Sequence, residues 1–511
     1  MPNLIDEILA LPTIGQKIDM LKKGRENCKM PDTVQNLKDW KVELHDIMDP
    51  KKFPDRKIVT KKGRKVYDKK TGEEFQEDDK TDTQKANHIS LPIEQDIINI
   101  QTGLTVGQEP SLTCDFNDNA EKDLMSAMQY TMLKNRMKYI NKKEMRSWLS
   151  EQEVAEYWYL APDDDGFWPK IAKKSTTISS GVMPKVRLKC SVWSPFHGDI
   201  LYPFFEGEEL TAFMRQYKQR TFDGGSIDCY QVVTKDKVYL WQMKDGTFQE
   251  TSFAHHLPKL PIMYAYRPEA YCSNIRPMRE RVEKTLSSYA DCIDYHFFPY
   301  LILMGQVGEV SGKLKNHVIR LQGEGAKASY LTWDQVPDTI KFEVETYIEQ
   351  MYSMKNTPRI SFENLKDMSA PSGTAFHFYF MGAELQVSNH AEIFGEFLQR
   401  RVNFLISSLG SINSRLFTPS QTIDVETEIQ PYTVDDLANK VDIALKATGG
   451  MPLWSQKHGM MFAGQIDHIN DEIAEIKAEH AQQTQQTQQK EPEQDPVPAN
   501  SKDDDKSGNK K

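Results

Sequence analysis

The chain has 511 residues, of which 39% are apolar and 27% charged, and its net charge is −10 at pH 7. These values indicate a globular protein with room for two or more hydrophobic cores. They argue against a sequence-specific nucleic-acid binder, because such proteins usually present a basic face, but they are compatible with a protein that DNA slides past.

The sequence carries no signal for a membrane or secreted protein. The longest apolar run, Phe297 to Met304, is far shorter than the roughly 20 residues that span a bilayer. The first residues lack the basic start and apolar core of a signal peptide. The six cysteines are scattered without a CxxC pair, which predicts reduced thiols in a cytosolic compartment.

Residues 1–85 combine short helical patterns with a charge-dense insert. Strand-like segments at 57–60 and 65–67 flank Gly63, which predicts a hairpin between residues 49 and 83. The basic run at 61–65 could touch phosphate, but the acidic residues that follow it favour a solvated loop.

Residues 86–272 mix both kinds of pattern. A helix is expected within 87–108, and a long helix or helix pair over 120–157. Strands are expected at 110–116, 185–193, 201–205 and 229–241, with a hairpin turn at 245–247.

Two amphipathic helices, residues 273–296 and 338–357, flank an insert at 297–337. Asn274 is the expected N-cap of the first helix, and Pro358 ends the second. The insert carries strand-like segments at 316–321 and 328–333. The charged residues of the first helix, among them Arg279 and Glu283, are expected on its outer faces. The residues expected to pack the two helices are Ile275, Met278, Val282, Leu286, Ile340, Val344 and Ile348.

A polar loop at 358–373 precedes a long helical pattern that begins at 374 and ends at Leu409. Phe376, Phe378 and Phe380 alternate with other residues, which locally favours a strand, but we predict helix there. A return strand is expected before 431, and further helices within 432–480. The composition of residues 481–511, rich in Gln, Pro, Lys and Asp, predicts disorder.

The search for catalytic motifs gives only weak candidates. P-loop, HExxH, GxSxG and GxGxxG patterns are missing. Asp163, Asp164 and Asp165 could hold Mg²⁺, although acid-rich turns are commoner. His255 and His256 could bind a transition metal, although a surface pair is the better interpretation. The three phenylalanines at 376–380 could stack bases, but a core or a subunit interface is favoured.

The order of these elements resembles the portal proteins of tailed bacteriophages, in particular the group related to the portals of Bacillus siphophages. The resemblance covers residues 85–480. It rests on Asn87 with Gly103, Gly107 and Pro110, on Leu260, Pro261 and Ile262 followed by Ser273, on Ser372 to Ala375, and on Thr448 to Phe462 followed by Asp467 and Glu472.

This resemblance implies an α+β, ring-forming portal fold, usually with about twelve subunits. The implied parts are an N-terminal arm and insert (1–85), an α/β wing (86–272, with a long helix and return strand at 374–431), a two-helix stem (273–296 and 338–357), a small α/β clip (297–337), a tunnel loop (358–373), a helical crown (432–480) and a disordered tail (481–511).

The implied function is that of a channel at one capsid vertex. The terminase large subunit packages double-stranded DNA through the ring, the DNA later leaves through it, and head-completion or adaptor proteins dock on it. Major capsid and scaffolding proteins are further expected partners. The protein would be assembled in the host cytoplasm, reside in the virion, and need no cofactor. Twelve copies at −10 would carry about −120, which repels phosphate within a Debye length of ~10 Å.

The resemblance also assigns candidate contact residues. In the tunnel loop, Arg359, Asn364, Lys366 and Asp367 are expected to face DNA. In the clip, Lys313, Lys315 and Arg320 are expected to contact terminase or an adaptor.

Two other classes of protein stay open at this point. One is a metal-dependent nuclease or other phage hydrolase that uses Asp163–Asp165 or the His255 pair. The other is a non-portal structural head protein, although head-tail adaptors are usually much shorter.

Overall fold

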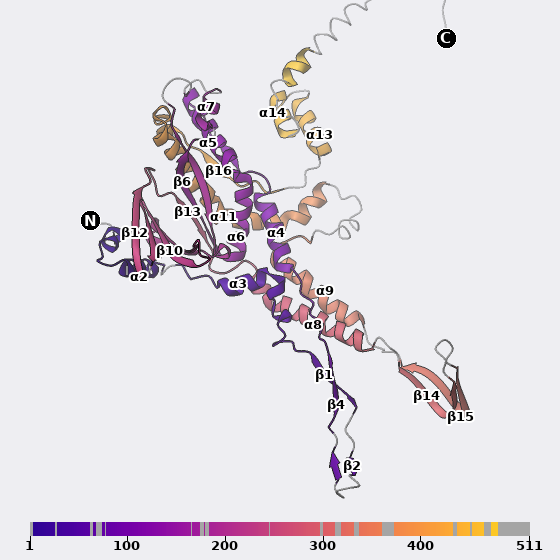
Figure 1. Cartoon of the computed structure of the whole chain (residues 1–511). Coiled ribbons are helices and arrows are strands. Elements are labelled where there is room, and N and C mark those ends of the chain that lie inside the picture. The colour runs from indigo at the N-terminus through magenta and orange to yellow at the C-terminus, as the bar shows by residue number, and fades with distance from the viewer. Residues whose placement is uncertain are drawn as a thin grey trace, which may run out of the picture. The chain divides into compact units, whose positions relative to one another are not determined.

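The computed structural model describes residues 4–25, 28–61, 65–67, 74–76, 78–164, 166–173, 178, 183–244, 246–296, 300–311, 318–331, 337–359, 373–432, 437–449, 452–463 and 472–478 (Figure 1). Helices and antiparallel strand pairs make up an α+β fold, as expected. The chain divides into two compact units, Met1–Ala370 with His377–Tyr432, and Pro371–Phe376 with Thr433–Lys511.

The first unit contains a five-stranded antiparallel sheet. Its strands follow sequence order: β8 (Ile200–Glu206), β9 (Glu209–Arg220), β10 (Ser226–Thr234), β11 (Lys237–Lys244) and β12 (Thr247–Ala254). Gly246 has a φ of 77° in the turn between β11 and β12, a conformation open to glycine without strain. Helices α1 (Leu4–Leu9) and α2 (Ile14–Lys23) bury their apolar residues in one cluster with Tyr202, Met214 and Trp241 of this sheet.

A smaller sheet has the order β13 (Ile262–Tyr266), β6 (Glu153–Pro162), β7 (Val186–Trp193). Trp193 and Tyr264 from this sheet pack with Phe213 of β9, so one core connects the two sheets. Two short elements, α7 (Phe167–Ala172) and η3 (Pro195–His197), flank β7 in sequence.

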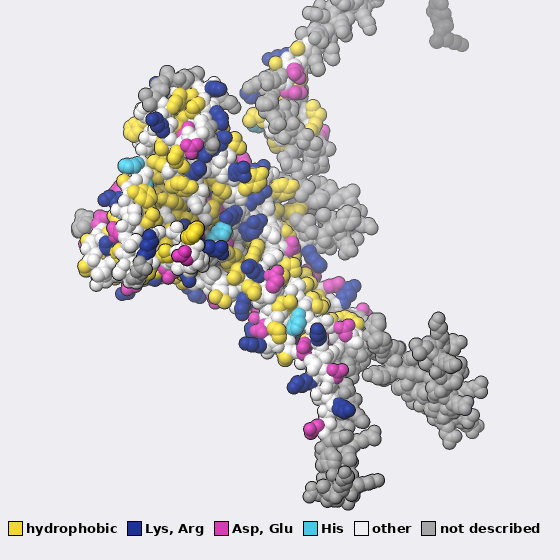
Figure 2. Space-filling view, in the orientation of Figure 1, with side chains coloured by type: hydrophobic (Ala, Val, Ile, Leu, Met, Phe, Trp, Pro, Cys, Tyr) yellow, Lys and Arg dark blue, Asp and Glu magenta, His cyan; other side chains and the backbone are white. Residues whose placement is uncertain are grey.

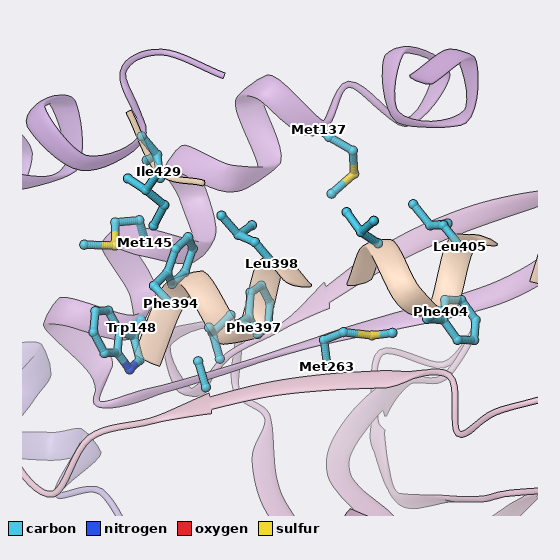
Figure 3. Packing of buried hydrophobic residues seen from close by; sticks show 14 of the residues in the cluster. Met137, Met145, Trp148, Met263, Phe394, Phe397, Leu398, Phe404, Leu405 and Ile429 are labelled. Carbon is cyan, nitrogen blue, oxygen red and sulfur yellow. The ribbon is translucent and has the colours of Figure 1, made fainter. Parts of the chain in front are cut away.

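The largest core lies among helices of the first unit. These are α4 (Ile93–Val106), α5 (Asn119–Asn135), α6 (Met137–Glu151) and α11 (Gly373–Ile412). Each large side chain that is fully buried there contributes about 1.5–3 kcal/mol to stability. Figure 3 shows Phe394, Phe397, Leu398, Phe404 and Leu405 of α11 among Met137, Met145, Trp148 and Met263.

One sequence expectation is corrected in this region, and another is confirmed. Residues 120–151 form a helix pair that breaks at Arg136, where φ is 57°, but residues 153–157 belong to strand β6 and not to the helix. The alternating phenylalanines at 376–380 lie within α11, as predicted, so helix prevails over their strand tendency.

The return strand predicted after the long helix is present. Beyond α11 the chain passes through η5 (Ser414–Leu416) and α12 (Pro419–Thr422) to β16 (Glu426–Glu428). Strand β16 pairs antiparallel with β5 (Ser111–Thr113), in the segment predicted as a strand at 110–116.

The N-terminal segment continues through α3 (Thr33–Trp40), η1 (Val42–Leu44) and η2 (Asp46–Met48). Strands are present at both predicted positions within 49–83, but these two strands do not pair with each other around Gly63; each pairs with a later strand. β1 (Arg56–Lys61) pairs with β4 (Lys80–Gln84), and β2 (Lys65–Tyr67) pairs with β3 (Glu74–Gln76).

The second unit contains α13 (Leu437–Thr448), α14 (Gln456–Ala463) and a helical segment at 472–478. The ring of Trp454 lies 5.0 Å from that of Phe462, which fixes α14 against the turn before it. The predicted tail at 481–511 lies outside the described residues. No helix among the described residues is both long and apolar enough to cross a membrane.

Candidate functional site

The two helices predicted around the insert lie side by side as α8 (Arg276–His296) and α9 (Pro337–Met354) (Figure 1). Between them run β14 (Tyr300–Ser311) and β15 (Val318–Leu331), an antiparallel pair. Strand β15 overlaps both segments that are predicted as separate strands, 316–321 and 328–333, and the ends of these segments lie outside the described residues. The described residues of the insert form strands only, so the helical part expected there is not seen among them.

The predicted packing residues mostly point inward. Val282 is buried, and Met278, Leu286, Val344 and Ile348 pack partly buried against the largest core. Ile340 is half exposed. Across the helix pair, Arg281 Nε donates to Glu343 Oε1 at 2.8 Å.

Both helix boundaries differ slightly from the prediction. Ser273–Ile275 form a 3₁₀ turn (η4), so Asn274 does not cap α8, which begins at Arg276. Helix α9 ends at Met354, four residues before Pro358, because Asn356 takes a left-handed φ of 47°.

A buried ionic cluster, here called the Arg279 cluster, joins α8 to three earlier segments. Arg279 donates to Glu94 of α4 at 2.7 Å, to Glu283 at 3.0 Å and to Asp39 of α3 at 3.2 Å. His45 Nδ1 lies 2.6 Å from Glu283 Oε1. The expectation that Arg279 and Glu283 lie on outer faces is therefore wrong, since their side chains are only 2% and 1% exposed.

The neighbouring carboxylates favour the charged form of Arg279. Burial by itself would lower the pKa of Arg279, but Glu94 and Glu283 raise it overall. Burial raises the pKa of Glu94, and Arg279 opposes that shift. Because removing one partner of such a network leaves the others buried and uncompensated, the cluster fixes the start of α8 against α3 and α4.

A second cluster, the Tyr271 cluster, fixes the end of α9. Tyr271 Oη donates to the Lys355 carbonyl at 2.9 Å, while Lys355 Nζ donates to the Tyr271 carbonyl and lies 4.5 Å from its ring. Gln101 of α4 donates to Thr357 Oγ1 at 2.8 Å. Burial lowers the pKa of Lys355.

The Tyr271 cluster also reaches α11. The His390 ring packs edge-on against Tyr271 at 5.2 Å and Trp148 at 5.7 Å, and the Arg267 guanidinium lies 4.7 Å from the Trp148 ring. Burial, with Arg267 and Lys355 near by, lowers the pKa of His390 to about 3. His390 is therefore neutral at physiological pH, and it links α11 to the same residues that hold the end of α9.

The predicted tunnel-loop residues are only partly seen. Arg359 is exposed, and its carbonyl accepts a hydrogen bond from Tyr379 Oη of α11 at 3.3 Å. Asn364, Lys366 and Asp367 lie outside the described residues. The Tyr271 cluster thus holds Thr357, directly before this loop, and contacts His390 further along the helix that follows the loop.

The predicted clip residues are likewise incompletely placed. Lys313 and Lys315 lie outside the described residues, between β14 and β15. Arg320 falls within β15.

The candidate metal sites have other roles. Asp163 Oδ1 accepts from the Phe167 amide at 2.8 Å, so this carboxylate holds the start of α7. Asp165 lies outside the described residues. His255 is buried, contrary to the surface prediction: Nε2 lies 3.0 Å from the Thr234 carbonyl and Nδ1 accepts from the Leu257 amide.

One group that sequence reasoning missed has metal-ligand chemistry. Atoms of Glu144, Glu156 and Cys190 lie within 4.8 Å of one another. Arg401 forms ion pairs with both carboxylates, at 2.6 Å from Glu156 and 2.7 Å from Glu144. Burial and the neighbouring Glu156 raise the pKa of Glu144 well above its ordinary value. This is an internal ionic network, here called the Arg401 cluster, in which the guanidinium of Arg401 lies where a metal ion would otherwise be needed.

The comparisons with known proteins decide the family. The family model described as "Phage portal protein, SPP1 Gp6-like" matches residues 31–486, which is most of the chain. The chain belongs to this phage portal protein family. As a portal protein it is a structural component of the head-to-tail connection, in a family that is not enzymatic.

Other comparisons add little to this assignment. The curated proteins contain no match to the chain. A chain of "Neck of empty GTA particle computed with C6 symmetry" is 10% identical with a TM-score of 0.39, over 73% of this portal protein and 90% of that chain. A chain of "Virion of native gene transfer agent (GTA) particle" is 8% identical with a TM-score of 0.37, over 87% and 99%.

Proposed function

We propose that this portal protein forms a ring of about twelve subunits at one capsid vertex. The ring is the channel through which the terminase large subunit packages double-stranded DNA and through which the DNA is later ejected. The family match over residues 31–486 carries this proposal. The arrangement of α8, the β14–β15 pair and α9 supports it, because it gives a two-helix element with an extended hairpin at its far end.

The parts of the ring are proposed as follows. Residues 273–296 and 338–357 are the stem, 297–337 the clip, 358–373 the tunnel loop, 86–272 with 374–431 the wing, and 432–480 the crown. In the clip, Lys313, Lys315 and Arg320 contact terminase and later head-completion proteins. Major capsid and scaffolding proteins surround the wing, and assembly takes place in the host cytoplasm.

The tunnel loop is the proposed contact with DNA, through Arg359, Asn364, Lys366 and Asp367. Two observations support this role. The Tyr271 cluster joins Thr357, directly before the loop, to His390 in α11, the helix that follows the loop, so forces on the loop would act on elements that are already linked. The loop also offers cations in a protein whose acidic residues exceed its basic ones, 74 to 64.

The channel is proposed to bind DNA weakly and without sequence preference. On the face seen in Figure 2, basic and acidic side chains lie interspersed in the region of α8 and α9. Phosphate therefore meets no continuous basic stripe on that face, and the acidic excess of the whole ring limits adhesion to DNA.

A packaging assay tests the function. In a phage that lacks its own portal gene, the wild-type chain should restore nuclease-protected DNA in heads, and N364A/K366A/D367A should form rings but protect several-fold less DNA. The matched control is K218A/D223A, at two exposed positions around the turn between β9 and β10. Equal DNA protection by loop variant and wild type would remove the proposed role of the loop.

A further inference from the structure

Phe342 is an apolar side chain that projects from α9 into solvent. It is 71% exposed. At about 100° per residue, a position two residues from Val344 lies on nearly the opposite face of the helix. Val344 packs against the core, so Phe342 points away from the core.

The stripe that carries Phe342 is acidic. Three acidic residues lie on the same helix face as Phe342. Asp338 precedes it by four residues, and Glu345 and Glu349 follow it by three and seven. Glu345 has an exposed partner in Lys341 at 3.8 Å. Asp338 and Glu349 have no ion pair among the described residues.

A depression of about 330 Å³ lies between α8 and the segment around η2, and no residue of α9 lines it. Ile47, Phe53 and Pro277 provide its apolar lining. At its rim, Lys52 is paired with Asp46, but Lys284 is exposed and makes no ion pair within the described part of the chain. The depression therefore combines an apolar floor with an unpaired cation.

The projecting ring and the depression lie at the same height along the helices. Arg281, which lines the depression, bonds Glu343, the neighbour of Phe342. In a ring whose axis follows the paired helices, every copy stands at the same height. Because the helices run antiparallel, Lys284 is then level with the first turn of a neighbouring α9, where Asp338 lies.

We propose that Phe342 of one copy inserts into the depression of the next, with Asp338 against Lys284 of that next copy. Each copy inserts its own Phe342 into one neighbour and accepts the Phe342 of the other neighbour in its depression. The contact is therefore head-to-tail and can close into a ring. This inference rests on the proposed ring, and it assigns the partner of both surfaces as a second copy of this chain.

Native mass spectrometry of full-length variants tests the contact. F342R should lower the fraction of chain in rings at least about tenfold, because it places a charge where an anchor is buried. F222R is the matched control, since Phe222 is 105% exposed in the turn after β9, and it should assemble as wild type does. Thermal unfolding of F342R monomers should match wild type, because the residue is exposed in the single chain.

Charge reversal and cross-linking give independent readouts. K284E and D338K should each reduce ring formation, and K284E/D338K should restore it. Under oxidation F342C/F53C should give a ladder of linked chains that neither single variant gives. Rings that form normally in F342R, with no ladder from the double cysteine variant, would overturn the contact and leave the portal function intact. A wild-type chain that forms no ring would overturn both.

Discussion

The two buried arginine clusters hold different helices and do so in different ways. The Arg401 cluster lies wholly inside the first unit, where Arg401 of α11 meets Glu144 and Glu156 from α6 and β6. The Arg279 cluster binds the start of α8 to α3, α4 and η2, and it is partly open, since the Arg276 side chain that shares Asp39 is 25% exposed.

The two clusters differ in how completely their charged groups are shielded from solvent. In the Arg401 cluster one cation faces two carboxylates, and burial favours the protonated form of Glu144. In the Arg279 cluster two arginines and His45 share three carboxylates. If Arg279 is substituted, water and Arg276 can therefore still compensate part of the carboxylate charge. The enclosed cluster should therefore be the more sensitive to substitution.

The largest effect is expected for R401M. It leaves Glu156 and Glu144 buried without their cation, which should lower the free energy of unfolding by about 5 kcal/mol. Urea unfolding of the purified chain measures it. R400M is the matched control, because the neighbouring Arg400 forms an exposed pair with Glu396 and should change stability by less than about 0.5 kcal/mol. Equal losses in both variants would contradict the account.

R279M should lower the free energy of unfolding by about 3 kcal/mol, less than R401M does, because Arg276 still neutralises Asp39. Hydrogen exchange should show loss of protection at the first turns of α8 while α11 stays protected. R281M, which removes only the exposed pair with Glu343, serves as control. A loss as large as that of R401M would show that the partly open cluster is no more tolerant than the enclosed one.

His390 predicts an acid-dependent loss of stability. Its pKa falls from 6.5 to about 3 on folding, so the unfolded chain binds a proton below pH 6.5 that the folded chain does not. Between pH 7 and pH 5 this costs the folded state about 2 kcal/mol. H390F keeps the ring contacts, so its free energy of unfolding should fall by about 2 kcal/mol less than that of wild type between pH 7 and pH 5. Urea unfolding at the two pH values measures this difference. The same pH dependence in H390F and wild type would contradict the low pKa of His390.

The smallest effect is expected for E144Q at pH 7. Folding raises the pKa of Glu144, so above about pH 4.5 the folded chain keeps a proton on Glu144 that the unfolded chain has released. The free energy of unfolding of the wild-type chain therefore falls as the pH rises above about 4.5. Glutamine resembles the protonated form, so E144Q should lie within about 1 kcal/mol of wild type at pH 7 and lose part of this pH dependence. A loss near that of R401M would show that Glu144 is charged in the fold.

Sequence patterns predicted the helices well because their apolar spacing is local. Val282 and Val344 were placed on the inward stripes of α8 and α9, and the helix through Phe376 to Phe380 was recognised despite its alternation. The burial of Arg279 could not be predicted in this way, because its partner Glu94 is 185 residues away and periodicity counts only apolar positions.

The same limit applies to the sites. The burial of His255 could not be predicted from the sequence, because the Thr234 carbonyl that its ring contacts lies at the end of β10, 21 residues earlier in the chain. The sequence predicts that α9 ends at Pro358, whereas Asn356 ends the helix earlier through a left-handed backbone conformation that the sequence does not indicate. The family itself was recognised from the order of weak motifs, and the family match confirms it.

The most direct test of the central claim is negative-stain electron microscopy of the purified full-length chain, combined with mass measurement. The account predicts rings of about twelve subunits with a central hole. A chain that remains a monomer or dimer under all assembly conditions would contradict it.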